Sequence, residues 1–113
     1  MEQSCRDPVE RYVSNAIIHG EATDVDCVNH ANDEVLAALS EIRKCDDLGR
    51  SILTDLLSHE NDSVRCWAAT HLLKLDEQRA RWVLQRLTKA KWPLGFTARI
   101  VLEEWRKGTL KTP

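Results

Sequence analysis

The sequence predicts an all-α fold of about six helices, arranged as three stacked antiparallel hairpins in a single domain, residues 1–113. Three observations support this. Apolar residues recur at three- and four-residue spacing through most of the chain. No stretch alternates apolar and polar residues over a useful length, as a half-buried strand would. Every connection between the helical segments is short, so consecutive helices should be antiparallel neighbours.

The first predicted hairpin spans residues 7–45 and forms an N-terminal capping unit. Asp7 is placed as an N-cap and Pro8 at the first helical position, and Gly20 can end this helix. A second helix follows over residues 25–44. We expect this hairpin to fit the repeat pattern below poorly, as terminal units of stacked-hairpin proteins do.

The second and third predicted hairpins span residues 46–75 and 76–108. The turn before the fourth helix is Asn61-Asp62-Ser63, and Asp76 is placed as the N-cap of the fifth helix. Pro93 should begin the sixth helix and Gly108 should end it.

These two hairpins repeat one pattern. Shifting the chain by 30 residues superposes apolar positions of one hairpin on those of the other. Each hairpin is amphipathic and cannot cover its own apolar stripe, which favours stacking. The matched pairs are Leu53 with Val83, Leu57 with Leu87, Val64 with Leu94, Ala68 with Ala98, Leu72 with Leu102 and Leu75 with Trp105.

The stretch from Leu53 to Leu73 resembles a single HEAT repeat, with a leucine-rich first helix, an Asp-containing turn, and then Val-Arg, an Ala pair and Leu on the second helix. The resemblance implies two roles. Asp62 would cap the second helix, and Arg65 would pair with the turn of a neighbouring repeat.

The region from Asp7 to Lys111 is similar to a family of short bacterial HEAT-like (armadillo-type) proteins formerly of unknown function. The similarity rests on Val64-Arg65-Cys66-Trp67-Ala68-Ala69, Leu72-Leu73 and the segment from Pro93 to Gly108. It implies a HEAT-like right-handed α-superhelix. Proteins of this type resemble immunity proteins of bacterial toxin and contact-dependent growth inhibition systems. We therefore expect a protein that binds and neutralises a cognate toxin, such as a nuclease.

The residue pattern gives no indication of an enzyme, a metal site or a cofactor. The histidines are His19, His30, His59 and His71, and they include no His-x-x-x-His pair. His19 and His59 fall near predicted helix C-termini, where the helix dipole favours partial charge. No phosphate-binding loop or nucleophile elbow is present.

The N-terminus has no apolar signal region, and no run of residues is long and apolar enough for a membrane span. We therefore expect a cytoplasmic protein without membrane contact. Its four cysteines lack zinc-knuckle or redox spacing and are expected to be reduced thiols, with Cys66 buried. They are Cys5, Cys27, Cys45 and Cys66.

Charge is distributed unevenly along the chain. Residues 1–63 hold 14 acids and 5 bases, and residues 64–113 hold 4 acids and 11 bases. An acidic surface can enter the basic cleft of a nuclease by mimicking substrate phosphates, although solvated faces of opposite sign would give the same counts. The acidic residues predicted to bind the partner are Glu21, Asp24, Asp26, Asp33, Glu34, Asp46 and Asp47.

The four tryptophans divide into two pairs. Trp67 and Trp105 occupy inward positions of their helices and are predicted to be core residues. Trp82 and Trp92 are predicted to anchor the partner if they are exposed; the alternative is that each packs over a hairpin junction.

Two other functions stay open. The basic C-terminal half suits a nucleic-acid-binding helical module, although the pI near 6.1 is low for one. A protein-assembly scaffold is the other alternative, and the oligomeric state is undetermined. The bases concerned are Arg79, Arg81, Arg86, Lys89, Lys91, Arg99, Arg106, Lys107 and Lys111.

Overall fold

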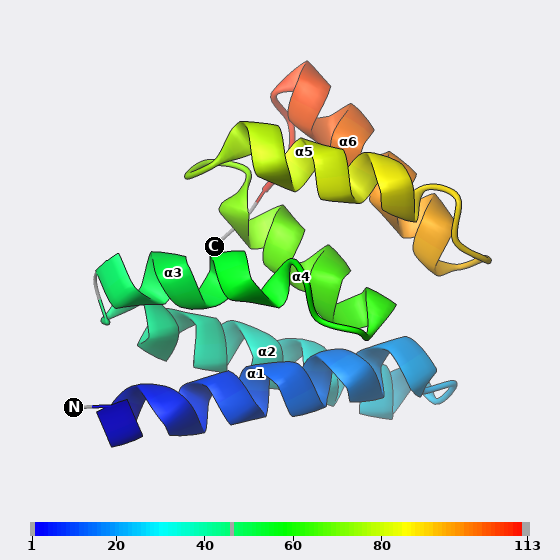
Figure 1. The fold of residues 1–113 in the computed structure, drawn as a ribbon. Helices are drawn as coiled ribbons and strands as arrows, with labels where there is room; N and C mark the ends of the chain where they lie inside the picture. The colour runs from blue at the N-terminus through cyan, green and yellow to red at the C-terminus, as the bar shows by residue number, and fades with distance from the viewer. Residues whose placement is uncertain (1, 46, 112–113) are drawn as a thin grey trace. The chain divides into compact units, whose positions relative to one another are not determined.

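The computed structural model describes residues 2–45 and 47–111, and it places the side chains of residues 6–45 and 48–111. Over this part of the chain it contains six helices and no strand, which confirms the all-α prediction (Figure 1). The helices are α1 (Glu2–Glu21), α2 (Val25–Arg43), α3 (Asp47–Leu56), α4 (Asp62–Leu72), α5 (Glu77–Leu87) and α6 (Leu94–Lys107). They form two compact units, residues 1–52 and 53–113, which share α3.

In the N-terminal unit, α1 and α2 lie antiparallel along their lengths (Figure 1). Tyr12 is fully buried on α1, and Val35 and Leu39 are fully buried on α2, so the two apolar stripes face each other. Asp24 is the N-cap of α2, and its carboxylate accepts a hydrogen bond from the N–H of Cys27 at 3.0 Å.

The first helix starts earlier than the sequence indicates. We expected Asp7 to be an N-cap, but α1 begins at Glu2 and Pro8 lies inside it. Pro8 is fully buried, so its ring contributes to the core and offsets the backbone hydrogen bond that a proline cannot donate.

The short link from α2 to α3 brings two backbones together. Gly49, in the first turn of α3, is buried, and a Cβ atom at this position would lie 2.4 Å from the carbonyl oxygen of Ile42 on α2. Contact this close leaves room only for glycine.

The C-terminal unit contains the last residues of α3 together with α4, α5 and α6. Helix α5 contacts both α4 and α6 (Figure 1). Its inward stripe is Ala80, Val83, Leu84 and Leu87, all of them buried. Two predicted ends of these helices are confirmed: Asp76 caps α5, and Gly108 ends α6 with a left-handed φ of 76°. Pro93 is the N-cap of α6, and the first helical residue is Leu94.

Burial differs between the two halves of the repeat. The α4 positions Val64, Ala68 and Leu72 are fully buried, whereas the matching α6 positions Leu94 and Leu102 are only half-buried. In the described residues α6 packs against α5 and, over fewer positions, against α4. Leu75, which the repeat pattern pairs with Trp105, follows the end of α4 and is exposed.

The turn between α3 and α4 departs from the HEAT-like expectation. Asn61, not Asp62, is the N-cap of α4, and it accepts hydrogen bonds from the N–H groups of Ser63 and Val64. Arg65 pairs with Asp62 and donates to the carbonyl of His59 at 2.8 Å, so it braces its own turn.

His59 also takes part in this turn in a way that the helix-dipole argument did not anticipate. Its Nδ1 accepts a hydrogen bond from the N–H of Asn61 at 3.0 Å. The ring therefore serves the turn as a hydrogen-bond acceptor.

The cysteines fall into three classes. Cys27 is an exposed free thiol, and Cys66 is a free thiol buried in the C-terminal core, as expected. Cys45 is disulfide-bonded, so the expectation of a reduced thiol is wrong at that position. The side chain of Cys5 lies outside the described residues.

We predict that Gly49→Ala destabilises the protein. Alanine is the better helix former by about 1 kcal/mol, but overpacking against a backbone carbonyl costs about 1–3 kcal/mol, so the net change is a loss. Urea unfolding followed by circular dichroism measures it. The control is Ser51→Ala, at an exposed position of the same helix. An unchanged or raised midpoint for Gly49→Ala would contradict the close approach.

We also predict that Cys27 and Cys66 differ strongly in reactivity. Burial raises the pKa of the Cys66 thiol to about 11, against the opposing effect of a hydrogen bond with Thr70. At pH 8 only about one Cys66 side chain in a thousand would be the reactive thiolate. Timed alkylation with iodoacetamide and mass spectrometry should show rapid modification of Cys27, and modification of Cys66 only in denaturant. Equal rates in the native protein would contradict this prediction.

Candidate functional site

A surface depression of the C-terminal unit lies between the last residues of α3 and the outer side of α5. It consists of two adjoining hollows of about 900 and 560 Å³, which share Leu57, Ser58, Trp82 and Val83. We call it the α5 groove. Its remaining lining residues are Thr54, Asp55, Asp62, Arg65, Gln78, Arg79, Arg81, Gln85, Arg86, Leu87, Lys89 and Ala90.

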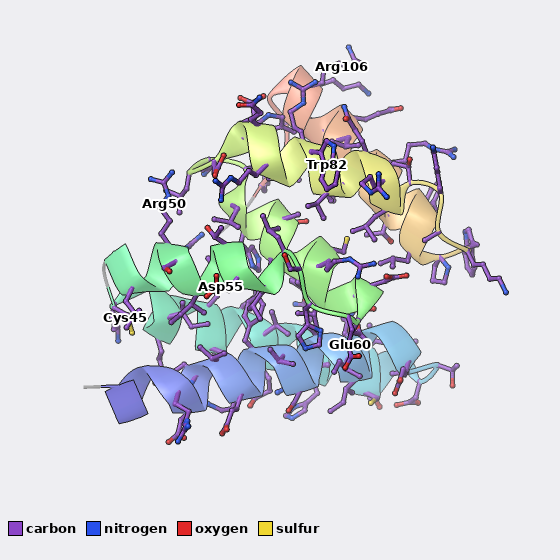
Figure 2. All side chains as sticks on the ribbon, viewed as in Figure 1. Cys45, Arg50, Asp55, Glu60, Trp82 and Arg106 are labelled. Carbon is purple, nitrogen blue, oxygen red and sulfur yellow. The ribbon has the colours of Figure 1, made fainter. Side chains whose placement is uncertain are left out.

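The periodicity of α5 decides which side chains reach this groove. Because its inward stripe repeats at three- and four-residue spacing, the residues between the stripe positions face outward. Trp82 directly precedes the buried Val83, so it is turned about 100° away from Val83 around the helix and faces outward. Figure 2 shows Trp82 on α5 and Asp55 on α3. The groove thus has a buried apolar floor and a polar rim.

Trp82 is the main apolar surface that the groove offers. It is 59% exposed. The guanidinium carbon of Arg86, one helical turn later, lies 4.8 Å from the centre of the Trp82 ring. This is a cation–π contact, and it places a positive charge directly beside the exposed ring. The exposure of Trp82 excludes the alternative that it is packed into a hairpin junction.

The other charges of the groove are mostly paired within their own helices. Arg79 pairs with Asp76 and Arg81 with Glu77, each at 3.5 Å, and Arg65 pairs with Asp62. These exposed pairs contribute little to stability, but they neutralise the cations locally.

Three charges of the groove keep no such partner. Across the described residues, Arg86, Lys89 and Asp55 form no ion pair. Arg86 and Lys89 line the smaller hollow, whereas Asp55 lines the larger one. The groove therefore has two unpaired cations toward one end and an unpaired carboxylate toward the other.

A second exposed surface lies along α6. Trp92 is 79% exposed, Phe96 52% and Ile100 42%. The last two lie four residues apart on α6, so they share one face of the helix, and Trp92 precedes that face by four residues. We call these three residues the α6 ridge.

Some of the acidic residues predicted to bind a partner already interact with other groups of the fold. Asp24 is occupied as the N-cap of α2. Glu34 is half-buried near Arg11, whose pKa is raised by its hydrogen bond to Glu41 and, less strongly, by the charge of Glu34. Exposed carboxylates remain at Glu21, Asp26 and Asp33. Asp46 and the side chain of Asp47 lie outside the described residues.

The two tryptophans expected in the core are only half-buried. The indole N–H of Trp105 donates to a carboxylate oxygen of Glu77 at 3.0 Å and so joins α6 to the start of α5. Trp67 packs its ring against His71, with the ring centres 5.5 Å apart. Both therefore act as amphipathic packing residues at the edge of the core.

The described side chains contain no group of three histidine, cysteine or acidic residues that could hold a metal ion. Among the described helices, none is both long and apolar enough to cross a membrane.

Comparison with known proteins supports the fold alone. No family model and no curated protein matches the chain. The crystal structure of the protein RPA1889 from Rhodopseudomonas palustris CGA009 is similar, with a TM-score of 0.84 over 96% of this chain and 93% of that chain. The two sequences are 23% identical. The six-helix arrangement is therefore one that a solved protein also adopts.

Sequence reasoning identified Trp82 and Trp92 as partner anchors and named Arg79, Arg81, Arg86 and Lys89 only for the nucleic-acid alternative, but it did not bring them together with Asp55 in one groove. Asp55 and Lys89 carry no local sequence signal of a shared groove, because α3 and α5 are distant in sequence. The pairing of Trp82 with Arg86 could have been found, since residues four apart are neighbours on a helix.

Proposed function

We propose that this chain is a protein-binding inhibitor whose main contact surface is the α5 groove. The observation that supports it is Trp82: more than half of the side chain is exposed, at a depression and not on a convex face. Tryptophan is enriched among the few residues that dominate interface energies, and centrally placed anchors of this kind are typical of such sites.

The specific role that we propose is immunity, in which the chain binds a bacterial toxin and covers its active or substrate-binding surface. The sequence resemblance motivates this role, and the exposed acids Glu21, Asp26 and Asp33 are compatible with it. They would attract the basic cleft of a nuclease and raise the association rate. We expect no catalytic activity of the chain itself.

A cytoplasmic site of action belongs to this proposal. The disulfide at Cys45 counts against it, because structural disulfides are rare in reducing compartments.

A nucleic-acid-binding module is a second candidate, and the contact of Arg86 with Trp82 favours it. An exposed ring with an adjacent cation is a typical platform for unpaired bases. The carboxylate of Asp55 and the net charge of −2 weigh against it, because both oppose phosphate binding.

We predict that Trp82→Ala abolishes capture of a protein partner from native lysate without unfolding the chain. Loss of a central tryptophan anchor costs about 2 kcal/mol or more, which is at least a roughly 30-fold loss of affinity. The free energy of unfolding should fall by no more than about 1 kcal/mol, the scale of an exposed cation–π contact. Tagged-protein capture with quantitative mass spectrometry, alongside thermal unfolding, measures both. Ile18→Ala, at an exposed apolar position of α1, is the control.

A stoichiometric partner with toxic activity that wild-type chain suppresses in a growth assay would establish the inhibitor role. Failure of the wild-type chain to retain any protein would contradict it.

For the nucleic-acid alternative, a labelled single-stranded oligonucleotide of about 20 nucleotides, longer than the site of one small domain, is the probe. We expect no binding by fluorescence anisotropy at physiological salt. Binding that weakens steeply as salt rises, and that is lost in Trp82→Ala, would instead identify a nucleic-acid platform.

A further inference from the structure

We infer that the α5 groove recognises an acidic amphipathic segment of the partner, with an apolar side chain against Trp82 and a carboxylate at Arg86 and Lys89. The inference rests on the proposed protein-binding function and specifies the chemistry of the bound segment.

The apolar part of the segment follows from the groove floor. Leu57, Val83 and Leu87 form that floor and are already buried by their own neighbours, so they offer little surface to a ligand. Trp82 alone retains a large accessible apolar face. One aliphatic or aromatic side chain of the segment could pack against the exposed face of this ring and cover it. The groove therefore suits a segment with one dominant apolar anchor.

The acidic part follows from the cations without partners. Arg86 and Lys89 carry the charge that the helix itself leaves unneutralised. The guanidinium of Arg86 lies over the ring of Trp82, so a carboxylate that binds it sits beside the apolar anchor. A guanidinium can bind a carboxylate through two parallel hydrogen bonds, which gives direction as well as attraction. On a helical segment the acid would lie three or four positions from the anchor.

Asp55 sets the polarity of the segment and distinguishes it from nucleic acid. It lines the larger hollow together with Trp82, and across the described residues it forms no ion pair. A second acid at that end would meet this like charge, and the two arginines there, Arg79 and Arg81, are already paired with Asp76 and Glu77, so the acids should gather at the end near Arg86 and Lys89. A nucleic-acid strand carries a phosphate at every nucleotide, so a strand that filled both hollows would place a phosphate near Asp55.

The test is selection of random peptides of about twelve residues, roughly three helical turns, displayed on phage against the immobilised full chain. We expect a consensus with one apolar anchor and Asp or Glu near it on one side only. The synthetic consensus peptide should bind at least tenfold more weakly to Trp82→Ala and to the double variant Arg86→Glu/Lys89→Glu, measured by fluorescence anisotropy. Phe96→Ala on the α6 ridge is the matched control and should bind normally.

A charge exchange separates recognition from a structural effect. The peptide with its acids replaced by Lys should bind the Arg86→Glu/Lys89→Glu variant at least tenfold more tightly than it binds wild-type chain. A consensus without acids, a failed exchange, or a loss of binding in Phe96→Ala alone would overturn the inference.

The outcomes also separate this inference from the proposed function. A lysate partner that is retained by wild-type chain and by both groove variants would overturn the groove chemistry and leave the protein-binding function standing. Peptide binding with the predicted consensus, in the absence of any protein partner that the chain inhibits, would support the groove chemistry and overturn the inhibitor role.

Discussion

The structure of the candidate site depends on the burial of one apolar stripe on α5. This helix has eleven residues, too few to be stable alone in water, so its packing must hold it in place. Ala80, Val83, Leu84 and Leu87 provide that packing. Rotating the helix by one residue would bring Trp82 inward and expose part of the stripe. The same burial that stabilises α5 therefore fixes Trp82 and Arg86 on the outside.

Much of the fold could be predicted because its signals are local. The stripe of α5, the Asp76 cap and the left-handed Gly108 each depend on a few neighbouring residues. Predictions failed where tertiary packing decided the outcome. The buried Pro8 is carried inside α1 by contacts that the cap pattern does not reveal. Trp105 is half-buried and donates its indole N–H to Glu77 on α5, a contact that a repeat alignment does not reveal.

The candidate site was harder to predict, for an electrostatic reason. Counting acids along the chain pointed to the N-terminal hairpin, but a count does not show which carboxylates are already occupied. Asp24 caps a helix and Glu34 interacts with the charge of Arg11, so both carboxylates already have partners within the fold. The groove combines α3 and α5, and no sequence spacing links Asp55 to Trp82. Of the contacts in the groove, only that between Trp82 and Arg86, four residues apart on α5, could be predicted from the sequence.

The distribution of charge on α5 connects stability with recognition. Its acids, Asp76 and Glu77, both lie at the N-terminus, where they complement the helix dipole and pair with Arg79 and Arg81 one turn later. No acid follows them on the helix, so Arg86 in the last turn has no acidic side chain of α5 to pair with. A cation there is favourable for the helix and at the same time remains available to a ligand. The cationic end of the groove thus follows from the order of charges that stabilises α5. Altering that order would change the stability of the helix and the charge of the groove together.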